Sequence, residues 1–262
     1  MAFTPLKYDL YDFPADFHPL LHDAEIYDSS YSLGAKVIFI DKDGGYYLKS
    51  APKGALEQES VMTRYFNAKG LAANVVDYIS EKKDWLLTEK IYGDNCLVLA
   101  DKYTDQPERL CDILAERLVM LHDLDSSDCP VQNNTERFLE RAEQNMRHGL
   151  FNKEIAEKNK LKNPTEAWNI VKRNGHLLKS KTLLHGDYSL PNILLNDWQF
   201  SGFIDLDTAG VGDRHIDLFW GSRTMDYNLV TNKYRQRFID AYGRDKVDEE
   251  ILQIVAAMAV FG

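Results

Sequence analysis

Three oxygen-bearing side chains, Asp187, Asn192 and Asp205, follow one another within a short stretch of the chain. Asp187 ends the sequence His-Gly-Asp after an apolar pair, Asn192 lies five residues later, and Asp205 lies 13 residues after Asn192. Transfer of a phosphoryl group from a nucleotide needs a group that receives the acceptor hydroxyl proton and oxygen ligands that hold Mg²⁺ on the phosphates. We expect Asp187 to receive the proton and Asn192 with Asp205 to bind Mg²⁺.

The order and spacing of these residues match the catalytic segment of protein kinases, where an Asp, an Asn and a second Asp after a hairpin perform these roles. Asn196-Asp197, between apolar runs at 193–195 and 203–204, predicts that hairpin. The alternative is a buried His-Gly-Asp turn followed by an unrelated Asp at a strand end. The complete pattern favours phosphoryl transfer, because a purely structural turn requires no amide and second carboxylate at fixed distances.

Composition and charge limit the class of protein. The chain has 262 residues, 44% of them hydrophobic and 27% charged, which suits one large globular domain or two lobes. The net charge of −10 argues against a nucleic-acid partner and suits a cationic small molecule. No signal-peptide pattern and no apolar run long enough to span a membrane occurs. The cysteines Cys96, Cys111 and Cys129 have no metal-ligand spacing and indicate reduced thiols in a cytoplasmic protein.

The first 90 residues have the pattern of a β-sheet with one helix. Strands are expected near 26–32, 37–40, 46–49, 75–79 and 85–89, where β-branched and aromatic residues gather. The loop at 29–34 has a single glycine, so a plain hairpin explains it as well as a phosphate-binding loop does. Farther along, apolar residues recur with helical spacing, most clearly over 107–122. This succession predicts an α+β chain.

A lysine at the end of one expected strand is a candidate phosphate ligand. Lys49 follows the run at 46–48, and a strand-borne lysine can neutralise the α- and β-phosphates of a nucleotide. The helix expected to begin near Ala55 carries Glu57 and Glu59, and either carboxylate can fix Lys49 by an ion pair.

The segment HGDYSLPNILL, followed by SGFIDLDTAGVGDRHIDL, resembles the aminoglycoside 3′-phosphotransferases within the wider group of aminoglycoside- and choline-kinase-like enzymes. The resemblance implies an α+β, two-lobed protein-kinase-like fold. A small antiparallel-sheet lobe at 1–90 would bind nucleotide, a hinge would lie at about 88–94, and a larger, mainly helical lobe at 95–262 would hold the catalytic and acceptor sites. The resemblance also implies Mg²⁺ and ATP or GTP, with the γ-phosphate passing to an aminoglycoside hydroxyl.

The family pattern assigns further residues to the nucleotide side. It selects Glu59, rather than Glu57, as the partner of Lys49. It places Tyr47 against the nucleotide base, with sheet packing as the alternative, and places Thr88 and Lys90 at the hinge, where backbone groups would pair with the base edge. Beyond the metal ligands, it gives Asp213 and Asp217 a bracing role, and His122 is expected to be structural.

The residues expected to bind the acceptor differ from the family pattern. There an acid-rich helical insertion binds substrate ammonium groups, but the segment 151–163 holds two acids, Glu154 and Glu157, against four lysines. Asp207-Thr208 stands where the family commonly has Gly-Arg, and the family's acidic pair near the C-terminus is absent, although Phe261 remains. We expect Glu154, Glu157, Asp207 and Phe261 to contact the acceptor, and the departures leave a less cationic acceptor open.

Three functions therefore stay open. The first is an aminoglycoside phosphotransferase, most like the 3′ type, that confers resistance. The second is a kinase of the same fold for another hydroxyl compound, such as a macrolide, choline, homoserine or an amino sugar. The third is a nucleotide-binding pseudokinase, against which the intact Lys49, Asp187, Asn192 and Asp205 argue. We expect a nucleoside triphosphate and a small, hydroxylated, cationic acceptor as partners, with no nucleic acid and no membrane. The sequence does not determine the choice of ATP or GTP, or the oligomeric state.

Overall fold

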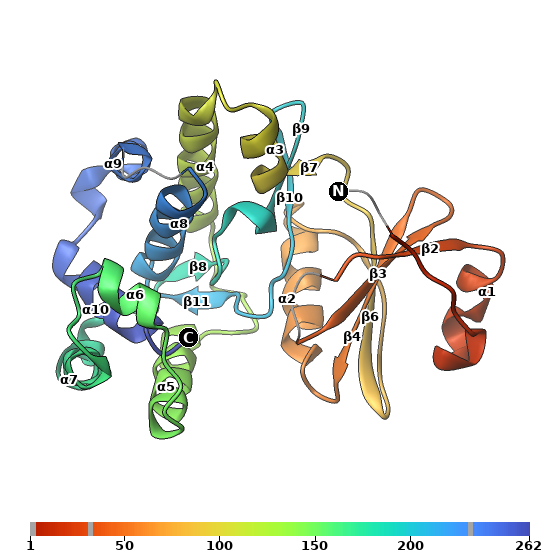
Figure 1. Ribbon diagram of the computed structural model, residues 1–262, viewed down its shortest axis with the longest axis horizontal. Coiled ribbons are helices and arrows are strands. Elements are labelled where there is room, and N and C mark those ends of the chain that lie inside the picture. Colours follow the sequence, from red (N-terminus) through yellow and green to blue (C-terminus); the bar gives the residue numbers. More distant parts are fainter. Residues whose placement is uncertain (1–3, 31–33, 230–232) are drawn as a thin grey trace. The chain divides into compact units, whose positions relative to one another are not determined.

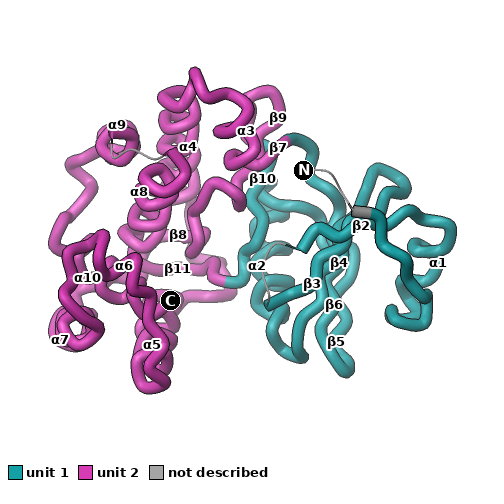
Figure 2. Tube along the Cα trace, viewed as in Figure 1, with its two compact units in different colours: residues 1–93, 201–207 teal, residues 94–200, 208–262 magenta. Residues whose placement is uncertain are grey.

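The computed structural model describes residues 4–30, 34–229 and 233–262, which form two compact units (Figures 1 and 2). Residues 1–93 and 201–207 make the first unit, and residues 94–200 and 208–262 make the second. Part of the loop at 29–34 lies outside the described residues. Within the described ranges, no helix is both long and apolar enough to cross a membrane.

The first unit is built on a six-stranded sheet with the order β1-β2-β3-β4-β6-β5, in which all neighbours are antiparallel. Its strands are β1 (Thr4–Pro5), β2 (Glu25–Asp28), β3 (Lys36–Asp41), β4 (Tyr46–Pro52), β5 (Val75–Ser80) and β6 (Lys83–Glu89). Before β2 lie η1 (Leu10–Asp12), η2 (Ala15–Phe17) and α1 (His18–Leu21), and after β4 lies α2 (Glu57–Ala68). The sheet with a single longer helix confirms the expected make-up of this part of the chain.

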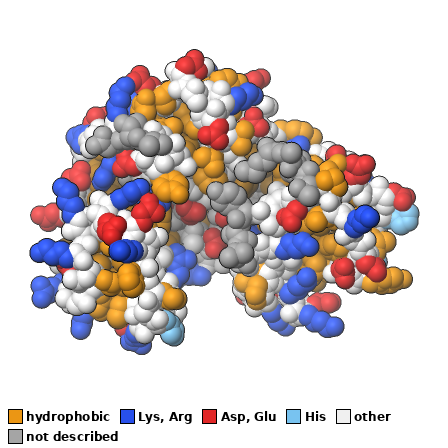
Figure 3. Space-filling view, in the orientation of Figure 1, with side chains coloured by type: hydrophobic (Ala, Val, Ile, Leu, Met, Phe, Trp, Pro, Cys, Tyr) orange, Lys and Arg blue, Asp and Glu red, His pale blue; other side chains and the backbone are white. Residues whose placement is uncertain are grey.

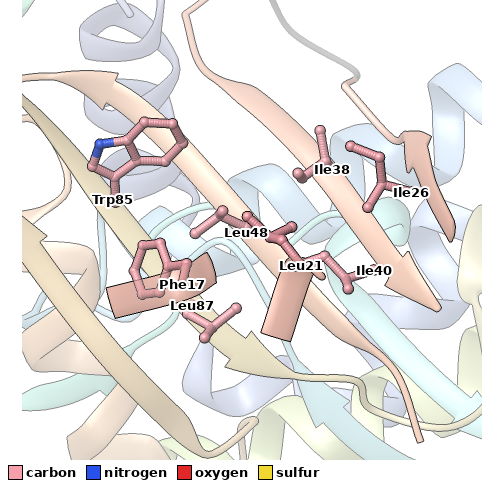
Figure 4. Close-up of a cluster of buried hydrophobic side chains, with 8 residues drawn as sticks. All are labelled: Phe17, Leu21, Ile26, Ile38, Ile40, Leu48, Trp85 and Leu87. Carbon is pink, nitrogen blue, oxygen red and sulfur yellow. The ribbon is translucent and has the colours of Figure 1, made fainter. Parts of the chain in front are cut away.

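One face of this sheet is the core of the first unit. Buried apolar side chains from the strands and the preceding turns gather there: Phe17, Leu21, Ile26, Ile38, Ile40, Leu48, Trp85 and Leu87 (Figure 4). Full burial of one such side chain contributes about 1.5–3 kcal/mol. Because successive residues of a strand point to opposite faces, Tyr47 and Lys49, which flank Leu48, point away from this core. The core therefore fixes β4 with Lys49 on the other face.

A short return of the chain, residues 201–207, belongs to the first unit. The backbone N–H of Phe203 donates to the carbonyl of Leu71 at 2.7 Å, and the Phe203 ring meets Phe66 edge-on at 6.2 Å. These contacts hold Asp205, two residues later, within the first unit. The sequence-based division at 90–95 left this segment in the second lobe, because a pairing between residues so far apart has no local sequence signature.

The second unit is mainly helical. Its helices are α3 (Cys96–Lys102), α4 (Pro107–His122), α5 (Asn134–Arg147), α6 (Lys153–Lys158), α7 (Pro164–Asn174), α8 (His215–Asn228), α9 (Lys233–Tyr242) and α10 (Glu249–Ala259), with the 3₁₀ turns η3 (Gly175–Leu177), η4 (Leu190–Asn192) and η5 (Arg244–Lys246). Strands β7 (Asp94–Asn95), β9 (Ile193–Asn196) and β10 (Gln199–Phe203) form one small sheet, and β8 (Thr182–Leu184) pairs with β11 (Gly210–Gly212). The helix predicted over 107–122 is confirmed as α4.

The hairpin predicted after Asn192 is confirmed as β9 and β10. At its turn, Asp197 and Trp198 both adopt positive φ, +49° and +64°. Tight two-residue turns need such angles to match the twist of the strands. Trp198 packs against Tyr103 with ring centroids 5.1 Å apart, which holds the turn on the second unit.

Candidate active site

One ammonium group binds two carboxylates in the first unit. Lys49 Nζ lies 2.7 Å from Glu59 Oε2 and 2.7 Å from Asp205 Oδ1. Lys49 extends from β4, Glu59 from the first turn of α2, and Asp205 from the segment after β10. Glu59 is 6% exposed, whereas Glu57 is exposed on the outside of the same turn. The partner of Lys49 in the structure is therefore Glu59, and Asp205 shares that lysine.

Burial and charge shift the titration of this cluster. Burial alone would lower the pKa of Lys49, but the charges of Glu59 and Asp205 raise it above its ordinary value. Burial raises the pKa of Glu59 to about 7, while Lys49 opposes the rise and the charges of Asp205 and Asp207 add to it. Lys49 therefore stays an ammonium group at neutral pH and is a permanent cation on this face. Asp207, expected at the acceptor, belongs to this same unit, where its charge acts on Glu59.

Tyr47 shares the face of β4 that carries Lys49. Its cross-strand neighbours are Phe39 on β3 and Thr88 on β6. The rings of Tyr47 and Phe39 lie 5.2 Å apart at 45°, and Tyr47 remains half-buried. Two expected nucleotide residues, Tyr47 and Thr88, are thus direct neighbours across the sheet, and Tyr47 also packs within it.

The backbone of the expected hinge is largely used by the sheet itself. Thr88 pairs with Tyr47 on one side and with Val75 on the other. The N–H of Lys90 donates to the carbonyl of Gly45 at 3.0 Å. The Lys90 N–H is therefore bonded within the first unit, and the nucleotide contact expected of Lys90 stays a prediction. The sequence did not show the bond because it joins the hinge to a turn 45 residues away.

In the second unit, Asp187 lies in the turn between β8 and η4. The side-chain nitrogen of Asn192 donates to Asp187 Oδ2 at 2.9 Å and to the Asp187 carbonyl at 3.1 Å. Asp187 is half-buried and Asn192 is 6% exposed. Because the amide nitrogen makes these bonds, the amide oxygen of Asn192 is directed away from Asp187. That oxygen is the atom of Asn192 that can meet a cation.

The backbone just before Asp187 is clamped by a buried carboxylate. Asp217, 0% exposed, accepts the N–H groups of His185 at 2.8 Å and Gly186 at 2.7 Å. His122 Nε2 lies 3.3 Å from the same carboxylate. Gly186 has a φ of +87°, and a Cβ at this position would lie 2.0 Å from a backbone carbonyl oxygen. The bracing role expected of Asp217 and the structural role expected of His122 are confirmed by these bonds.

Asp213 braces the neighbouring segment in a similar way. Its carboxylate accepts the backbone N–H of Lys179 at 2.7 Å and that of His215 at 3.0 Å, and it contacts His215 Nδ1 at 2.7 Å. Burial raises the pKa of Asp213, but these hydrogen bonds outweigh it and hold the pKa below its usual value. Asp213 and Asp217 therefore both organise the backbone on either side of the turn that carries Asp187.

Helix α8 supports the other end of the turn at residues 185–190, which we call the catalytic turn because of the role expected of Asp187. The hydroxyl of Thr224 accepts the backbone N–H of Leu190 at 3.2 Å. A Cβ added to Gly221 would lie 3.2 Å from the ring of Tyr188, so the helix packs closely on the residue after Asp187. Sequence reasoning missed Thr224, because a threonine inside a helix gives no signal of a partner 34 residues away.

The residues expected at the acceptor lie in two different environments. Glu154 contacts Lys158 at 2.9 Å and Arg223 at 3.7 Å, and Glu157 contacts a neighbouring lysine at 3.6 Å. Phe261 is 2% exposed, and its ring meets that of Trp168 edge-on at 5.9 Å. Phe261 is thus buried in the core, and the acceptor contact expected of it stays a prediction. The apolar residues just before it are buried as well.

The chain is similar to known proteins. Residues 32–253 match the model of the phosphotransferase enzyme family. The chain is 47% identical over 258 residues to the probable aminoglycoside 3′-phosphotransferase of Lactococcus lactis subsp. lactis (strain IL1403), and the alignment covers 98% of each chain.

Solved structures show the same fold. The crystal structure of aminoglycoside-3′-phosphotransferase of type VIII has a TM-score of 0.74 and 21% identity, covering 91% of this chain and 94% of that chain. The aminoglycoside phosphotransferase APH(3″)-Id from Streptomyces rimosus ATCC10970, in complex with ADP and streptomycin, has a TM-score of 0.68 and 22% identity, covering 87% and 91%. The expected α+β, kinase-like fold is thereby confirmed.

Proposed function

The chain belongs to the phosphotransferase enzyme family, and we propose that it transfers the γ-phosphate of ATP or GTP to the 3′-hydroxyl of an aminoglycoside. The observation that carries this proposal is the 47% identity to a probable aminoglycoside 3′-phosphotransferase across 98% of both chains. The solved relative with bound ADP and streptomycin supports a nucleotide donor and an aminoglycoside acceptor. Resistance to the modified antibiotic is the expected consequence.

On the nucleotide side, we assign Lys49 to the α- and β-phosphates and Glu59 to its orientation. The 2.7 Å ion pair between them supports both assignments. Tyr47, on the same face of β4, is assigned to the base. These groups bind and position the donor, and positioning with charge neutralisation provides most of the catalysis in phosphoryl transfer.

The oxygen donors of Asp205 and Asn192 fit Mg²⁺. Mg²⁺ takes hard oxygen ligands and is held by one or two side chains together with phosphates and waters. The proposed site needs no dense cluster, and none of three or more His, Cys, Asp or Glu side chains occurs in the described part of the chain. When bound, the metal neutralises charge on the β- and γ-phosphate oxygens. Lys49 already holds Asp205 at 2.7 Å, so that carboxylate is oriented before any ligand arrives.

On the acceptor side, we assign Asp187 to the reacting hydroxyl. Its carboxylate accepts the hydroxyl proton and directs the oxygen toward the γ-phosphorus. Asn192 holds Asp187 Oδ2 at 2.9 Å, and the Asp217 clamp holds the backbone that precedes it. Loss of a positioned general base typically costs about 10²- to 10⁴-fold in rate.

A second function, a kinase of the same fold for a less cationic hydroxyl compound, is favoured by one observation. Glu154 and Glu157, the acids expected to bind ammonium groups, both lie in ion pairs with lysines of their own helix. Phe261, another residue expected at the acceptor, is 2% exposed. A macrolide or a small amino alcohol is therefore the alternative acceptor class.

We also assign the protein to the cytoplasm. Cys96 and Cys111 are buried thiols, and burial raises the pKa of Cys111 to about 12. Such thiols are unreactive at neutral pH. Their use as ordinary core residues suits a reducing compartment.

Nucleotide turnover with Mg²⁺ across aminoglycosides, macrolides and small amino alcohols tests the function, with ATP and GTP compared as donors. We expect turnover with kanamycin- or neomycin-type compounds. Asp187→Asn should lower it by about 10²-fold or more while nucleotide affinity stays within about twofold. Asp197→Asn, at the exposed hairpin turn, is the matched control and should retain activity. Turnover with only another acceptor class would show that the substrate is not an aminoglycoside. Full activity of Asp187→Asn would show that Asp187 is not the general base.

A further inference from the structure

Helix α9 ends in a buried tyrosine that contacts the histidine at the end of α4. Tyr242 is 2% exposed, and its hydroxyl oxygen lies 2.8 Å from Nδ1 of His122. The two rings also meet edge-on, with their centroids 5.6 Å apart. The two residues are 120 positions apart in the chain, so this contact depends on how α9 packs on α4.

The contacts continue from His122 to the backbone of the catalytic turn. His122 Nε2 lies 3.3 Å from Asp217 Oδ2, and the same oxygen accepts the N–H of His185 at 2.8 Å. The other oxygen of Asp217 accepts the N–H of Gly186 at 2.7 Å. The Tyr242 hydroxyl is therefore connected, through two buried side chains, to the residue that precedes the proposed general base.

The hydrogen-bond donors along this connection can all point in one direction. Arg214, just before α8, also interacts with the Tyr242 hydroxyl. Because a guanidinium only donates hydrogen bonds, the hydroxyl accepts from Arg214 and directs its own proton to Nδ1 of His122. Nδ1 then carries no proton, and the Nε2–H group donates to the Asp217 carboxylate. Both carboxylate oxygens stay available as acceptors for the backbone N–H groups of the turn.

Helix α9 is held on α4 by other contacts as well. Arg237 binds Asp112 through two hydrogen bonds, at 2.7 Å from Nε and 2.6 Å from Nη2, and Lys233 lies 2.9 Å from Glu108. Acidic and basic side chains lie side by side on the surface over α4 and α9 (Figure 3). On the inner side of α9, Phe238 is fully buried. The helix can therefore keep its place when the tyrosine hydroxyl alone is removed.

Resting on the proposed function, we propose that Tyr242 is a positioning residue for phosphoryl transfer. Acting through His122 and Asp217, its hydroxyl holds the backbone that directs the general base toward the acceptor hydroxyl. Without the hydroxyl, Nδ1 of the buried ring has no partner, and the ring holds the carboxylate less firmly. A displacement of about 1 Å at a reacting group can cost about 10²-fold in rate, so a small movement of the turn is enough to lower kcat.

Hydrogen exchange tests the connection without any substrate. Tyr242→Phe keeps the ring and removes only the hydroxyl. We expect the amide protons of His185 and Gly186 to exchange at least about tenfold faster in this variant than in the wild type, because their acceptor is less firmly held. The amide of Lys179 is the internal control, because another buried carboxylate, that of Asp213, accepts its proton at 2.7 Å. Its exchange should change by less than about twofold.

Steady-state kinetics of the same variant tests the effect on the reaction. Tyr242→Phe should lower kcat about five- to tenfold and leave the nucleotide KM within about twofold, because the hydroxyl acts on the turn and not on the nucleotide. Arg237→Gln is the matched control. It removes the ion pair between α9 and α4, leaves the hydroxyl in place and should retain kcat. An equal loss of kcat in both variants would show that α9 acts only by packing, and would overturn the proposal.

A double variant tests the route through the histidine. In a His122→Asn background, Tyr242→Phe should lower kcat no further, because the connection is already broken. A further fall in kcat of the same size as in the wild-type background would overturn the proposal.

The exchange measurement separates this proposal from the proposed function. Turnover by the wild type tests the function alone. If the wild type turns over no acceptor, faster exchange at His185 and Gly186, with Lys179 unchanged, still supports the positioning of the turn by Tyr242. Unchanged exchange at these two amides, or an equal increase at Lys179, overturns it. Faster exchange with unchanged kcat in an active enzyme also overturns it, because the hydroxyl would then have no role in the reaction.

Discussion

The buried carboxylate of Asp217 accepts a 2.7 Å hydrogen bond from the backbone N–H of Gly186, the residue that precedes Asp187. A second bond, from the N–H of His185, reaches the other carboxylate oxygen at 2.8 Å. Each oxygen of Asp217 is therefore assigned to one backbone donor. The position of the proposed general base depends on a side chain 30 residues later in the chain.

Asp217→Asn should lower both stability and activity. The substitution replaces one acceptor oxygen by an amide NH₂, which cannot accept from the backbone N–H that faces it. An unsatisfied buried donor costs about 1–3 kcal/mol, and the shifted turn should lower kcat about tenfold or more. Urea unfolding and steady-state kinetics measure the two effects. Unchanged kcat in a folded variant would contradict a role of the clamp in positioning Asp187.

Asp84→Asn is the matched control for that variant. Asp84 is also 0% exposed, and its carboxylate accepts the backbone N–H of Leu56 at 2.9 Å and the hydroxyl of Ser80 at 2.7 Å. It lies on β6, on the face of the sheet opposite Trp85, and has no bond to the catalytic turn among those described. We expect a similar loss of stability with kcat retained for the folded fraction.

Gly186→Ala should prevent correct formation of the catalytic turn. Gly186 has a φ of +87°, and an added Cβ would lie 2.0 Å from the carbonyl oxygen of Thr208, so the backbone must move. We expect a loss of at least about 3 kcal/mol or a failure to fold. Gly54→Ala is the control, because Gly54 has a nearly equal φ of +84° with no atom within 4 Å. Its cost should be about 1 kcal/mol, and equal effects of the two variants would show that φ alone matters.

The sequence predicted the structural features that depend on residues close together in the chain. The spacing of Asp187 and Asn192 identified their turn, and the structure shows the two side chains bonded. The helical spacing over 107–122 gave α4 with its bounds. In both cases the information lies within a few residues, where periodicity and spacing are strong signals.

Contacts between segments that lie far apart in the sequence were not predicted. The bond from the Lys90 N–H to Gly45 occupies a group that the sequence-based view assigned to the nucleotide base. The burial of Phe261 against Trp168 depends on how the last helix packs. The support of Leu190 by Thr224 joins two segments 34 residues apart. Such contacts depend on tertiary packing, which a single sequence does not record.

Glu59→Gln should weaken nucleotide use more than stability. The substitution removes the buried carboxylate from Lys49 and leaves the ammonium group with Asp205, 2.7 Å away. Lys49 should then be drawn away from the phosphates, and kcat/KM for the nucleotide should fall by roughly thirtyfold, or about 2 kcal/mol of transition-state stabilisation. Glu57→Gln is the control, because Glu57 lies two residues before Glu59 and is exposed, and it should retain activity. If both variants behave alike, Glu59 does not orient Lys49.

The stability of the second unit should depend on the pH through His122. Its Nε2 faces the Asp217 carboxylate at 3.3 Å, and its Nδ1 lies 2.8 Å from the hydroxyl of Tyr242. In the neutral ring Nε2 donates to the carboxylate and Nδ1 accepts from the hydroxyl. Burial lowers the pKa of His122, and Asp217 only partly opposes this shift. The unfolded chain, with an ordinary histidine pKa of about 6.5, binds a proton that the folded chain excludes below that pH. The contribution of a neutral His122 is therefore complete above about pH 6.5 and is lost as the pH falls, by at most about 1.4 kcal/mol per pH unit.

Urea unfolding of the wild type and His122→Asn at pH 7.5, 6.5 and 5.5 measures this dependence. The difference in unfolding free energy between the two proteins should shrink as the pH falls, because the variant has no proton to exclude. His148→Gln, which changes an exposed histidine at the end of α5, should follow the wild type. If the difference in unfolding free energy between the wild type and His122→Asn stayed constant across this pH range, His122 would take up its proton equally in the folded and unfolded chain. The assignment of a neutral His122 ring between Asp217 and Tyr242 would then be wrong.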